Sequence, residues 1–217
     1  MGSSRDFFRS HPETLRLYAV TDTSWLEGRT LDECILDAFR GGATFFQLRD
    51  KHASTEELIE QFSRLRRLLP EEVPFVVNDD VEAALAAHAD GVHVGQSDAA
   101  CHEARRILGS EKIVGVSVQT VEQALAAQDA GADYLGVGAL FKTATKPEAA
   151  DVDLSTLSDI CRAVDIPVVA IGGLNEDTVA ALEGSGVEGA AVVSALFSAS
   201  DVRRAAQGLK EAVDRVV

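Results

Sequence analysis

A short loop rich in hydroxyl and ammonium groups follows one of the most apolar stretches of this chain. The loop is FKTATK at 141–146, and the strand-like run before it is YLGVGAL at 134–140. The formal net charge of the chain is −15 at pH 7, so the two lysines give this loop a charge of opposite sign to that of the chain as a whole. Hydroxyl and ammonium groups both donate hydrogen bonds to phosphate oxygens. The loop therefore indicates a phosphate site, although a solvated surface loop would have the same composition.

Polar and glycine-rich segments also follow other apolar runs, each at the point where the run ends. These segments are QLRDK at 47–51, NDD at 78–80, GQSD at 95–98, GVS at 115–117, GG at 172–173 and VS at 193–194. Asp79 or Asp80, with Asp98, supplies the carboxylate oxygens that Mg²⁺ prefers when it also binds substrate phosphates. One member of the pair could instead cap a helix that starts near Val81. The segments therefore indicate a candidate magnesium site.

Cationic side chains in the same segments suit a pyrophosphate. Arg49 matches its forked geometry, and Lys51 and Lys146 act as point charges. The pairs at 172–173 and 193–194 follow the last two strand-like runs, where barrels often bind a phosphate through backbone N–H groups; a plain tight turn is the alternative for the glycine pair. No Ser-His-Asp or Cys-His pattern indicates acyl transfer. These residues predict a Mg²⁺-dependent enzyme acting on a diphosphate and a phosphate ester.

Alternating strands and helices are expected to position these residues. Apolar runs predict strands at 16–21, 43–49, 74–78, 91–95, 112–118, 134–140, 167–171 and 189–194. Helical periodicity predicts helices at 31–40, 55–68, 81–89, 99–108, 120–130, 154–163, 175–183 and 201–217, with Asp201 and Asn175 as N-caps. Eight such units predict an α/β fold, a single (β/α)₈ TIM barrel over 1–217. An open doubly wound sheet is the alternative, and 1–16 form an N-terminal extension that either closes the barrel bottom or is a loose tail.

Composition and charge exclude several classes of protein. No run of about 18 apolar residues is present, so we expect no membrane span. The net acidity disfavours broad binding to nucleic acid. Cys34, Cys101 and Cys161 include no C-x-x-C pair, which fits a reducing cytosol and a cytoplasmic protein, and each is expected on a helix. His93 lies in a strand-like run, where a satisfied interior histidine is favoured over a catalytic one.

Beyond this residue logic, the chain resembles the thiamin phosphate synthase family from about Leu17 to its end. The motifs that carry the resemblance are LYAVTD at 17–22, QLRDK at 47–51, VPFVVNDD at 73–80, DGVHVGQSD at 90–98, GVS at 115–117, GADYLGVGALFKTATK at 131–146, PVVAIGG at 167–173 and VVSALF at 192–197. Many motifs in the right order are far more specific than any one of them. The resemblance implies a TIM barrel that joins 4-amino-2-methyl-5-hydroxymethylpyrimidine diphosphate to 4-methyl-5-(2-hydroxyethyl)thiazole phosphate, or its carboxylated form. It also implies thiamin phosphate and pyrophosphate as products and a dissociative mechanism in which pyrophosphate leaves first.

The resemblance further implies a role for each residue at a matching position. Asp79 and Asp98 resemble the Mg²⁺ ligands, and Gln47 resembles the residue that binds the pyrimidine ring. The implied pyrophosphate and pyrimidine contacts are Arg49, Lys51, Asn78, Lys146 and Ser117, of which Arg49, Lys51, Lys146 and Ser117 are the implied catalytic residues. The implied thiazole phosphate contacts are Thr143, Thr145, Gly173, Val193 and Ser194. The expected partners are these two small molecules, with no nucleic acid or membrane, and a homo-oligomer is left open.

Two positions depart from the family pattern. Gln119 replaces a histidine that often follows the fifth strand, and Lys142 replaces a proline that often precedes the Thr-x-Thr-Lys segment. Gln119 can still form hydrogen bonds, and Lys142 either adds positive charge or faces water. A thiazole tautomerase-like barrel and a non-catalytic regulatory barrel are the alternatives. The complete set of diphosphate residues favours the synthase over both.

Overall fold

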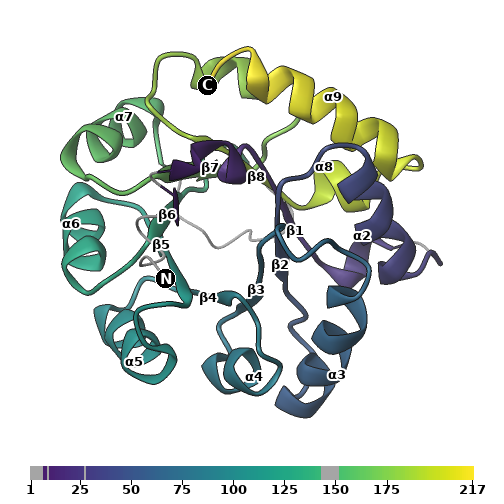
Figure 1. Ribbon diagram of the computed structural model, residues 1–217. Coiled ribbons are helices and arrows are strands. Elements are labelled where there is room, and N and C mark those ends of the chain that lie inside the picture. The colour runs from purple at the N-terminus through teal and green to yellow at the C-terminus, as the bar shows by residue number, and fades with distance from the viewer. Residues whose placement is uncertain (1–6, 9, 27, 143–151) are drawn as a thin grey trace.

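The computed structural model describes residues 7–8, 10–26, 28–142 and 152–217. In this part of the chain, parallel strands form one closed barrel in the order β1 to β8 (Figure 1). The strands are β1 (Leu17–Val20), β2 (Phe45–Leu48), β3 (Phe75–Asn78), β4 (Gly91–Val94), β5 (Ile113–Val118), β6 (Tyr134–Val137), β7 (Val168–Ile171) and β8 (Gly189–Val192). Strand β1 pairs with β8 as well as with β2, so the predicted TIM barrel is confirmed and the open sheet is wrong.

Helices surround the barrel and follow the strands in the alternating order that the sequence predicts (Figure 1). The α-helices are α2 (Leu31–Arg40), α3 (Thr55–Arg66), α4 (Val81–Ala86), α5 (Asp98–Leu108), α6 (Val121–Asp129), α7 (Leu154–Ala163), α8 (Ser194–Phe197) and α9 (Val202–Asp214). Short 3₁₀ helices are η1 (Pro12–Leu15), η2 (Thr23–Trp25) and η3 (Val179–Leu182). Side-chain caps fix several helix starts; Asp201, for example, accepts a hydrogen bond from the Arg204 N–H at 2.9 Å, as predicted.

The helix predicted at 175–183 is wrong. The Asn175 side chain accepts hydrogen bonds from the backbone N–H groups of Asp177 and Thr178, at 2.9 and 3.0 Å, and only η3 follows. Such side-chain bonds offer the backbone an alternative to a regular helix. Helix α8 was not predicted either: Ser194 is the last residue of the strand predicted at 189–194, and the other three residues of α8 lie between that strand and the helix predicted at 201–217.

Two apolar layers hold the barrel together. The larger layer lies between the strands and the surrounding helices and includes the buried Cys34 and Cys101; Cys161 is half-buried, and all three cysteines lie on helices, as predicted. The smaller layer fills the barrel interior and includes Tyr18, Phe45 and Tyr134. Strand side chains alternate between the two layers, as expected for a sheet that is buried on both faces.

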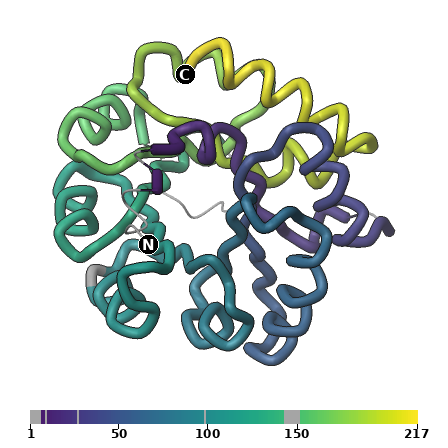
Figure 2. Tube along the Cα trace, in the orientation of Figure 1, coloured from purple at the N-terminus to yellow at the C-terminus, as the bar shows by residue number. Residues whose placement is uncertain are grey.

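The N-terminal segment reaches the barrel interior. Phe8 is 1% exposed, and its ring lies 5.8 Å from Tyr134 and 6.2 Å from Phe45. Figure 2 shows this segment, in purple, over the ring of strands. Phe8 belongs to the same interior cluster as Leu15, which precedes β1, so it covers the end of the barrel where the strands begin. Among the described residues, no helix is both long and apolar enough to cross a membrane.

Candidate active site

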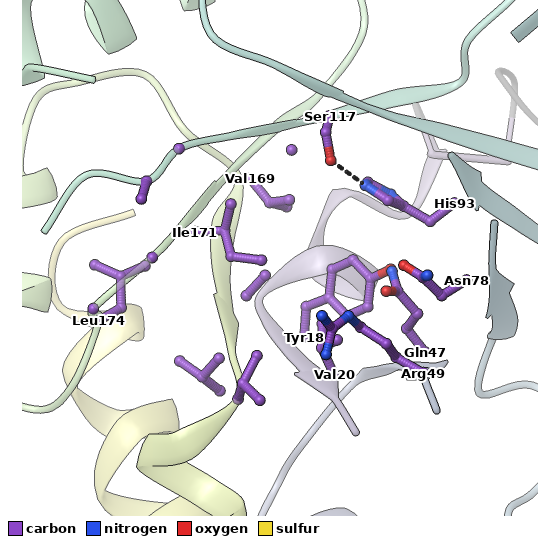
Figure 3. A pocket seen from close by; sticks show the side chains of 18 of the residues that line it. Tyr18, Val20, Gln47, Arg49, Asn78, His93, Ser117, Val169, Ile171 and Leu174 are labelled. Carbon is purple, nitrogen blue, oxygen red and sulfur yellow. Dashed lines mark hydrogen bonds between the residues drawn. The ribbon is translucent and has the colours of Figure 1, made fainter. Parts of the chain in front are cut away.

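A cavity of about 460 Å³ opens at the carboxyl ends of the strands, the end where such barrels carry out their chemistry (Figure 3). Many of the predicted site residues line it although they are far apart in the chain. They are Gln47, Arg49, Asn78, Ser117, Gly173, Val193 and Ser194. Closure of the barrel brings these strand ends together, so the cavity is the candidate active site.

The two walls of the cavity differ in chemistry. Side chains from β2 to β5 make one wall polar; Figure 3 shows Arg49, Asn78 and His93 on the right. Residues of β7 and the loop after it make the opposite wall apolar, with Val169 and Ile171 on the left of the same view. The cavity therefore has a polar wall that can bind charge and an apolar wall that can pack against a ring.

Arg49 is held by a buried acidic partner that the sequence analysis did not identify. Arg49 is 8% exposed, and its Nη1 lies 2.8 Å from Oδ2 of Asp22, which follows β1. Burial by itself would raise the pKa of Asp22, but hydrogen bonds from Ser24 and the nearby Arg49 charge together hold that pKa below its usual 3.8. Arg49 thus presents a guanidinium of fixed direction to the cavity.

The neighbouring aspartates after β3 have different surroundings. Asp80 caps α4: it accepts hydrogen bonds from the Ala83 N–H and the Thr55 hydroxyl, both at 2.7 Å. Asp79 is exposed, has a backbone φ of 60°, and accepts a hydrogen bond from Asn78 Nδ2 at 2.7 Å. Since the capping role belongs to Asp80, Asp79 is the candidate metal ligand of the pair.

The donor set around Asp79 fits a hard cation. Asp79 and the amide of Asn78 offer oxygen atoms at the end of β3, and Mg²⁺ often binds through only one or two carboxylates plus water and substrate phosphates. Asp98 begins α5, but its side chain lies outside the described residues. The described side chains include no group of three or more His, Cys, Asp or Glu residues that could hold a metal ion.

A chain of hydrogen bonds runs beneath the polar wall. Gln47 Nε2 donates to the Tyr18 hydroxyl, which lies 2.8 Å from the Tyr134 hydroxyl. Tyr134 lies 2.9 Å from His93 Nδ1, and His93 Nε2 lies 3.0 Å from the Ser117 hydroxyl oxygen. Burial raises the pKa of both tyrosines, so the phenols stay neutral. The expectation of a satisfied interior histidine is confirmed, and His93 also lines the cavity.

The glycine pair after β7 makes a close contact with the segment after β6. Gly172 and Gly173 have φ values of 100° and 65°, which disfavour other residues. A Cβ on Gly172 would lie 2.6 Å from Ala139 Cα, and one on Gly173 would lie 2.7 Å from Phe141 Cβ. Besides lining the cavity, the pair thus lets two loops approach each other.

The remaining residues that the sequence singled out differ in their position relative to the cavity. Lys51 is exposed and does not line the cavity, and Lys142 is exposed, as expected for a residue that faces water. Gln119 lines the cavity and donates a hydrogen bond from Nε2 to the Gly138 carbonyl at 3.2 Å. Thr143, Thr145 and Lys146 lie outside the described residues.

Sequence reasoning missed Asp22, Tyr18 and Tyr134. The two tyrosines are the only ones in the chain, and both stand in apolar runs predicted to be strands. A buried phenol needs a hydrogen-bond partner, so two strand tyrosines indicate a polar group inside the barrel. Asp22 stands two residues after the end of β1, at the carboxyl end of the strand, where the position rule applied to the other strands would have identified it.

Comparisons with known proteins place the chain among relatives of similar length. The family model for thiamine monophosphate synthase matches residues 17–196. The chain belongs to this family. It is 45% identical to the thiamine-phosphate synthase of Ruminiclostridium cellulolyticum, over 90% of the chain and 93% of the relative. It is 48% identical to that of Chloroflexus aurantiacus, over 94% and 95%.

A solved structure of the same family has the same architecture. The thiamine phosphate pyrophosphorylase from Pyrococcus furiosus superposes with a TM-score of 0.86 at 40% identity, covering 95% of this chain and 98% of that one. The predicted family is therefore confirmed. The chain is a transferase of thiamine biosynthesis, a thiamine-phosphate diphosphorylase.

Proposed function

We propose that this synthase joins 4-amino-2-methyl-5-hydroxymethylpyrimidine diphosphate to 4-methyl-5-(2-hydroxyethyl)thiazole phosphate or its carboxylated form. The observation that carries the proposal is the cavity with one polar and one apolar wall, at the carboxyl ends of the strands in a member of this family. Two flat rings with anionic tails need such a cavity, because the rings pack on apolar side chains while the tails require charge and hydrogen-bond donors.

The reaction in this proposal is dissociative. The bond between the pyrimidine methylene carbon and the diphosphate oxygen breaks, and its electron pair leaves with pyrophosphate. The ring amino group stabilises the resulting carbocation, and the thiazole nitrogen then donates its lone pair to form the new C–N bond. With the carboxylated thiazole, the carboxylate then leaves as CO2, its C–C electron pair stays on the ring carbon, and a proton from water takes its place. No protein nucleophile is needed, so the residues of this chain act by binding, orienting and stabilising charge.

The polar wall binds the diphosphate and the pyrimidine in this assignment. The Arg49 guanidinium, fixed by Asp22, and the Asn78 amide contact the leaving group, together with Lys51, which follows β2, and Lys146, which follows β6 in the chain. Gln47 and Ser117 contact the pyrimidine. Lys51 is exposed at the rim, so it would have to reach inward when substrate binds.

Asp79 and Asp98 would hold the Mg²⁺ ion. When bound, the ion neutralises charge that builds up on the departing pyrophosphate. Asp79 supports the assignment through its exposed position next to Asn78, and through the separate capping role of Asp80. Asp98 begins the helix that follows β4, the neighbour of β3 in the barrel.

The other end of the cavity would bind the thiazole phosphate. Gly173, Val193 and Ser194 line it after β7 and β8, and α8 begins at Ser194. The backbone N–H groups at the start of a helix have no partners within that helix and suit phosphate oxygens. Thr143 and Thr145 complete this assignment from the loop after β6.

Incubation of the protein with both substrates and Mg²⁺ tests the proposal. We expect pyrophosphate release that requires the thiazole phosphate and yields thiamin phosphate. The control omits the thiazole partner. A folded, Mg²⁺-supplied sample that releases no pyrophosphate would contradict the proposal and favour the tautomerase-like or regulatory barrel; conversion of a thiazole phosphate tautomer would distinguish between these two.

A further inference from the structure

The hydrogen-bond chain below the cavity has a defined direction. Gln47 uses its amide N–H to donate to Tyr18, so the Tyr18 oxygen is an acceptor in that bond. The Tyr18 hydrogen can then point to the Tyr134 oxygen, 2.8 Å away, and the Tyr134 hydrogen to His93 Nδ1, 2.9 Å away. The reverse direction would require the Gln47 amide oxygen to face Tyr18, because the Tyr18 hydrogen would need that oxygen as its acceptor. With the Gln47 amide nitrogen facing Tyr18, the arrangement that pairs every hydroxyl hydrogen runs from Gln47 to His93.

This direction determines where His93 carries its proton. If Nδ1 accepts from Tyr134, neutral His93 has its hydrogen on Nε2. Nε2 then donates to the Ser117 oxygen at 3.0 Å (Figure 3). The Ser117 hydroxyl, which accepts this bond, keeps its own hydrogen for another acceptor, and Ser117 lines the cavity. The last group of the chain is therefore a donor at the cavity wall.

Glycines in the neighbouring strands make room for the chain. A Cβ on Gly115 of β5 would lie 2.2 Å from Cζ of the Tyr134 ring, and one on Gly136 of β6 would lie 3.2 Å from Cε1 of His93. Gly115 pairs with both His93 and Tyr134 in the strand register, and Gly136 pairs with Ser117. Glycines of β5 and β6 thus leave the space that the two rings occupy.

We propose that Tyr18, Tyr134 and His93 are positioning residues that hold the Ser117 hydroxyl as a hydrogen-bond donor toward the substrate. None of the three needs to touch the reacting atoms. They act through Ser117 at one end of the series of hydrogen bonds, and at the other end they fix the orientation of the Gln47 amide. This inference rests on the proposed contacts of Ser117 and Gln47 with the pyrimidine, and it names the residues that set the direction of both side chains.

A simpler account would treat the chain as buried polar groups that satisfy one another. Phenylalanine at 18 and 134 would fill nearly the same space without any need for partners. In this protein the bonds instead continue through five strands, from β1 and β2 to β4, β5 and β6, and end at the cavity. The two accounts predict different results for the tautomer of His93 and for the coupling of variants.

The tautomer can be measured without any substrate. Nitrogen-15 NMR of labelled wild-type protein distinguishes a protonated from a bare ring nitrogen. We expect His93 to be neutral near pH 8 with the hydrogen on Nε2, and we expect Tyr134→Phe to add a population with the hydrogen on Nδ1. A wild-type His93 with its hydrogen on Nδ1 would overturn the proposal. His93 would then donate to Tyr134, and the hydrogen bonds would be donated in the direction from His93 to Gln47.

A double-mutant cycle tests the action through Ser117. Tyr134→Phe removes one hydroxyl, and we expect kcat to fall about tenfold with KM changed less than about twofold, the effect of one well-placed hydrogen bond. In a Ser117→Ala background the same change should lower kcat less than about twofold. A tenfold loss in both backgrounds, or no loss in either, would overturn the proposal.

Two further variants keep the result interpretable. Ser185→Ala is the control: it removes a buried hydroxyl that donates to the Leu182 carbonyl at 2.7 Å and is not part of the hydrogen bonds between Gln47 and Ser117. This variant should leave kcat unchanged. Tyr18→Phe replaces Tyr134→Phe in the cycle if the latter variant does not fold. Failure of the proposed function would appear as wild-type protein without pyrophosphate release. Failure of this inference would appear as an active wild type with the wrong tautomer or with additive variants.

Discussion

Asp79 and Asp80 are adjacent in sequence and have separate tasks in the structure. Asp80 bonds to the first turn of α4 and to Thr55 of α3, whereas Asp79 is exposed with φ in the left-handed region. Aspartate and asparagine tolerate that conformation better than most residues. The pair therefore separates helix stability from the proposed binding of Mg²⁺, and single substitutions can test each task.

We expect Asp79→Asn to lower kcat at limiting Mg²⁺ by about a hundredfold or more while the unfolding free energy changes little, because asparagine keeps the backbone but loses the charge. The matched control is Asp80→Ala, which should lower the unfolding free energy by about 1 kcal/mol through loss of the cap. Steady-state kinetics across Mg²⁺ concentrations and denaturant unfolding measure the two effects. Near-normal activity of Asp79→Asn would remove this residue from the metal site.

The buried ion pair of Arg49 and Asp22 predicts a pH dependence of stability. The pKa of Asp22 is lower in the folded than in the unfolded protein, so the carboxylate stabilises the fold above pH 3.8 and loses this contribution as pH falls through its folded pKa. We expect Asp22→Asn to be less stable at pH 7 by on the order of 1 kcal/mol, after allowance for solvent screening. Denaturant unfolding of both proteins from pH 7 to pH 3 should show this difference shrinking below pH 3.8. A constant difference would mean that the charge of Asp22 does not matter.

The sequence was sufficient to select the candidate site residues at the strand ends, but it did not predict which side chains they contact. Gln47, Arg49, Asn78 and Ser117 could be selected because each stands at a strand end. Which side chain faces Arg49 depends on the distance between β1 and β2, which single-strand patterns do not specify. The choice of Asp80 as the cap likewise depends on backbone geometry at Asp79, so the sequence left both aspartates open.

At the scale of elements, two aspartates connect a strand to a helix in the same way, and each stands directly before the next strand. Asp90 accepts a hydrogen bond from the Phe75 N–H at 2.8 Å and pairs with Arg66 of α3. Asp133 accepts one from the Val114 N–H at 2.8 Å and pairs with Arg105 of α5. Each aspartate therefore joins the start of one strand to the helix that precedes that strand in the chain.

Strand β5 provides a test of the space reserved for Tyr134. We expect Gly115→Ala to lower the unfolding free energy by about 2–3 kcal/mol, because the added methyl group overlaps a buried ring whose neighbours are packed. Gly95→Ala is the control, since a Cβ there meets no atom within 4 Å, and it should change stability by less than about 1 kcal/mol. Equal stability of the two variants in thermal and denaturant unfolding would show that the ring moves aside easily.

Most elements were predictable because their signals are local. Helical periodicity placed α2 and α7 at their observed bounds. The strand predicted at 134–140 was too long, since β6 ends at Val137 and the following residues pair with the loop after β7. That pairing depends on Gly172 and Gly173 lying next to this segment, which is a tertiary contact.

At the scale of the whole molecule, Phe8 belongs to the barrel although it precedes β1 by many residues. It is buried against Phe45 and Tyr134, so the described part of the N-terminal extension closes the barrel bottom rather than forming a loose tail. The sequence could not decide this, because a single aromatic residue before the first strand has no period.

We expect Phe8→Ala to lower the unfolding free energy by about 3–4 kcal/mol through lost burial and the cavity left behind. Phe7→Ala is the matched control: Phe7 is 37% exposed, and its loss should cost less than about 1 kcal/mol. Denaturant unfolding monitored by circular dichroism measures both. A small effect of Phe8→Ala would show that the interior collapses readily onto the vacated space.

The unequal walls of the cavity bear on the design of inhibitors. A planar heteroaromatic molecule with all its heteroatoms along one edge matches this asymmetry in a single orientation, whereas its regioisomer with heteroatoms on both edges must press a solvated group against Val169 and Ile171. Discrimination between such isomers then comes from dehydration rather than from shape, and it should persist in analogues that carry no phosphorus at all.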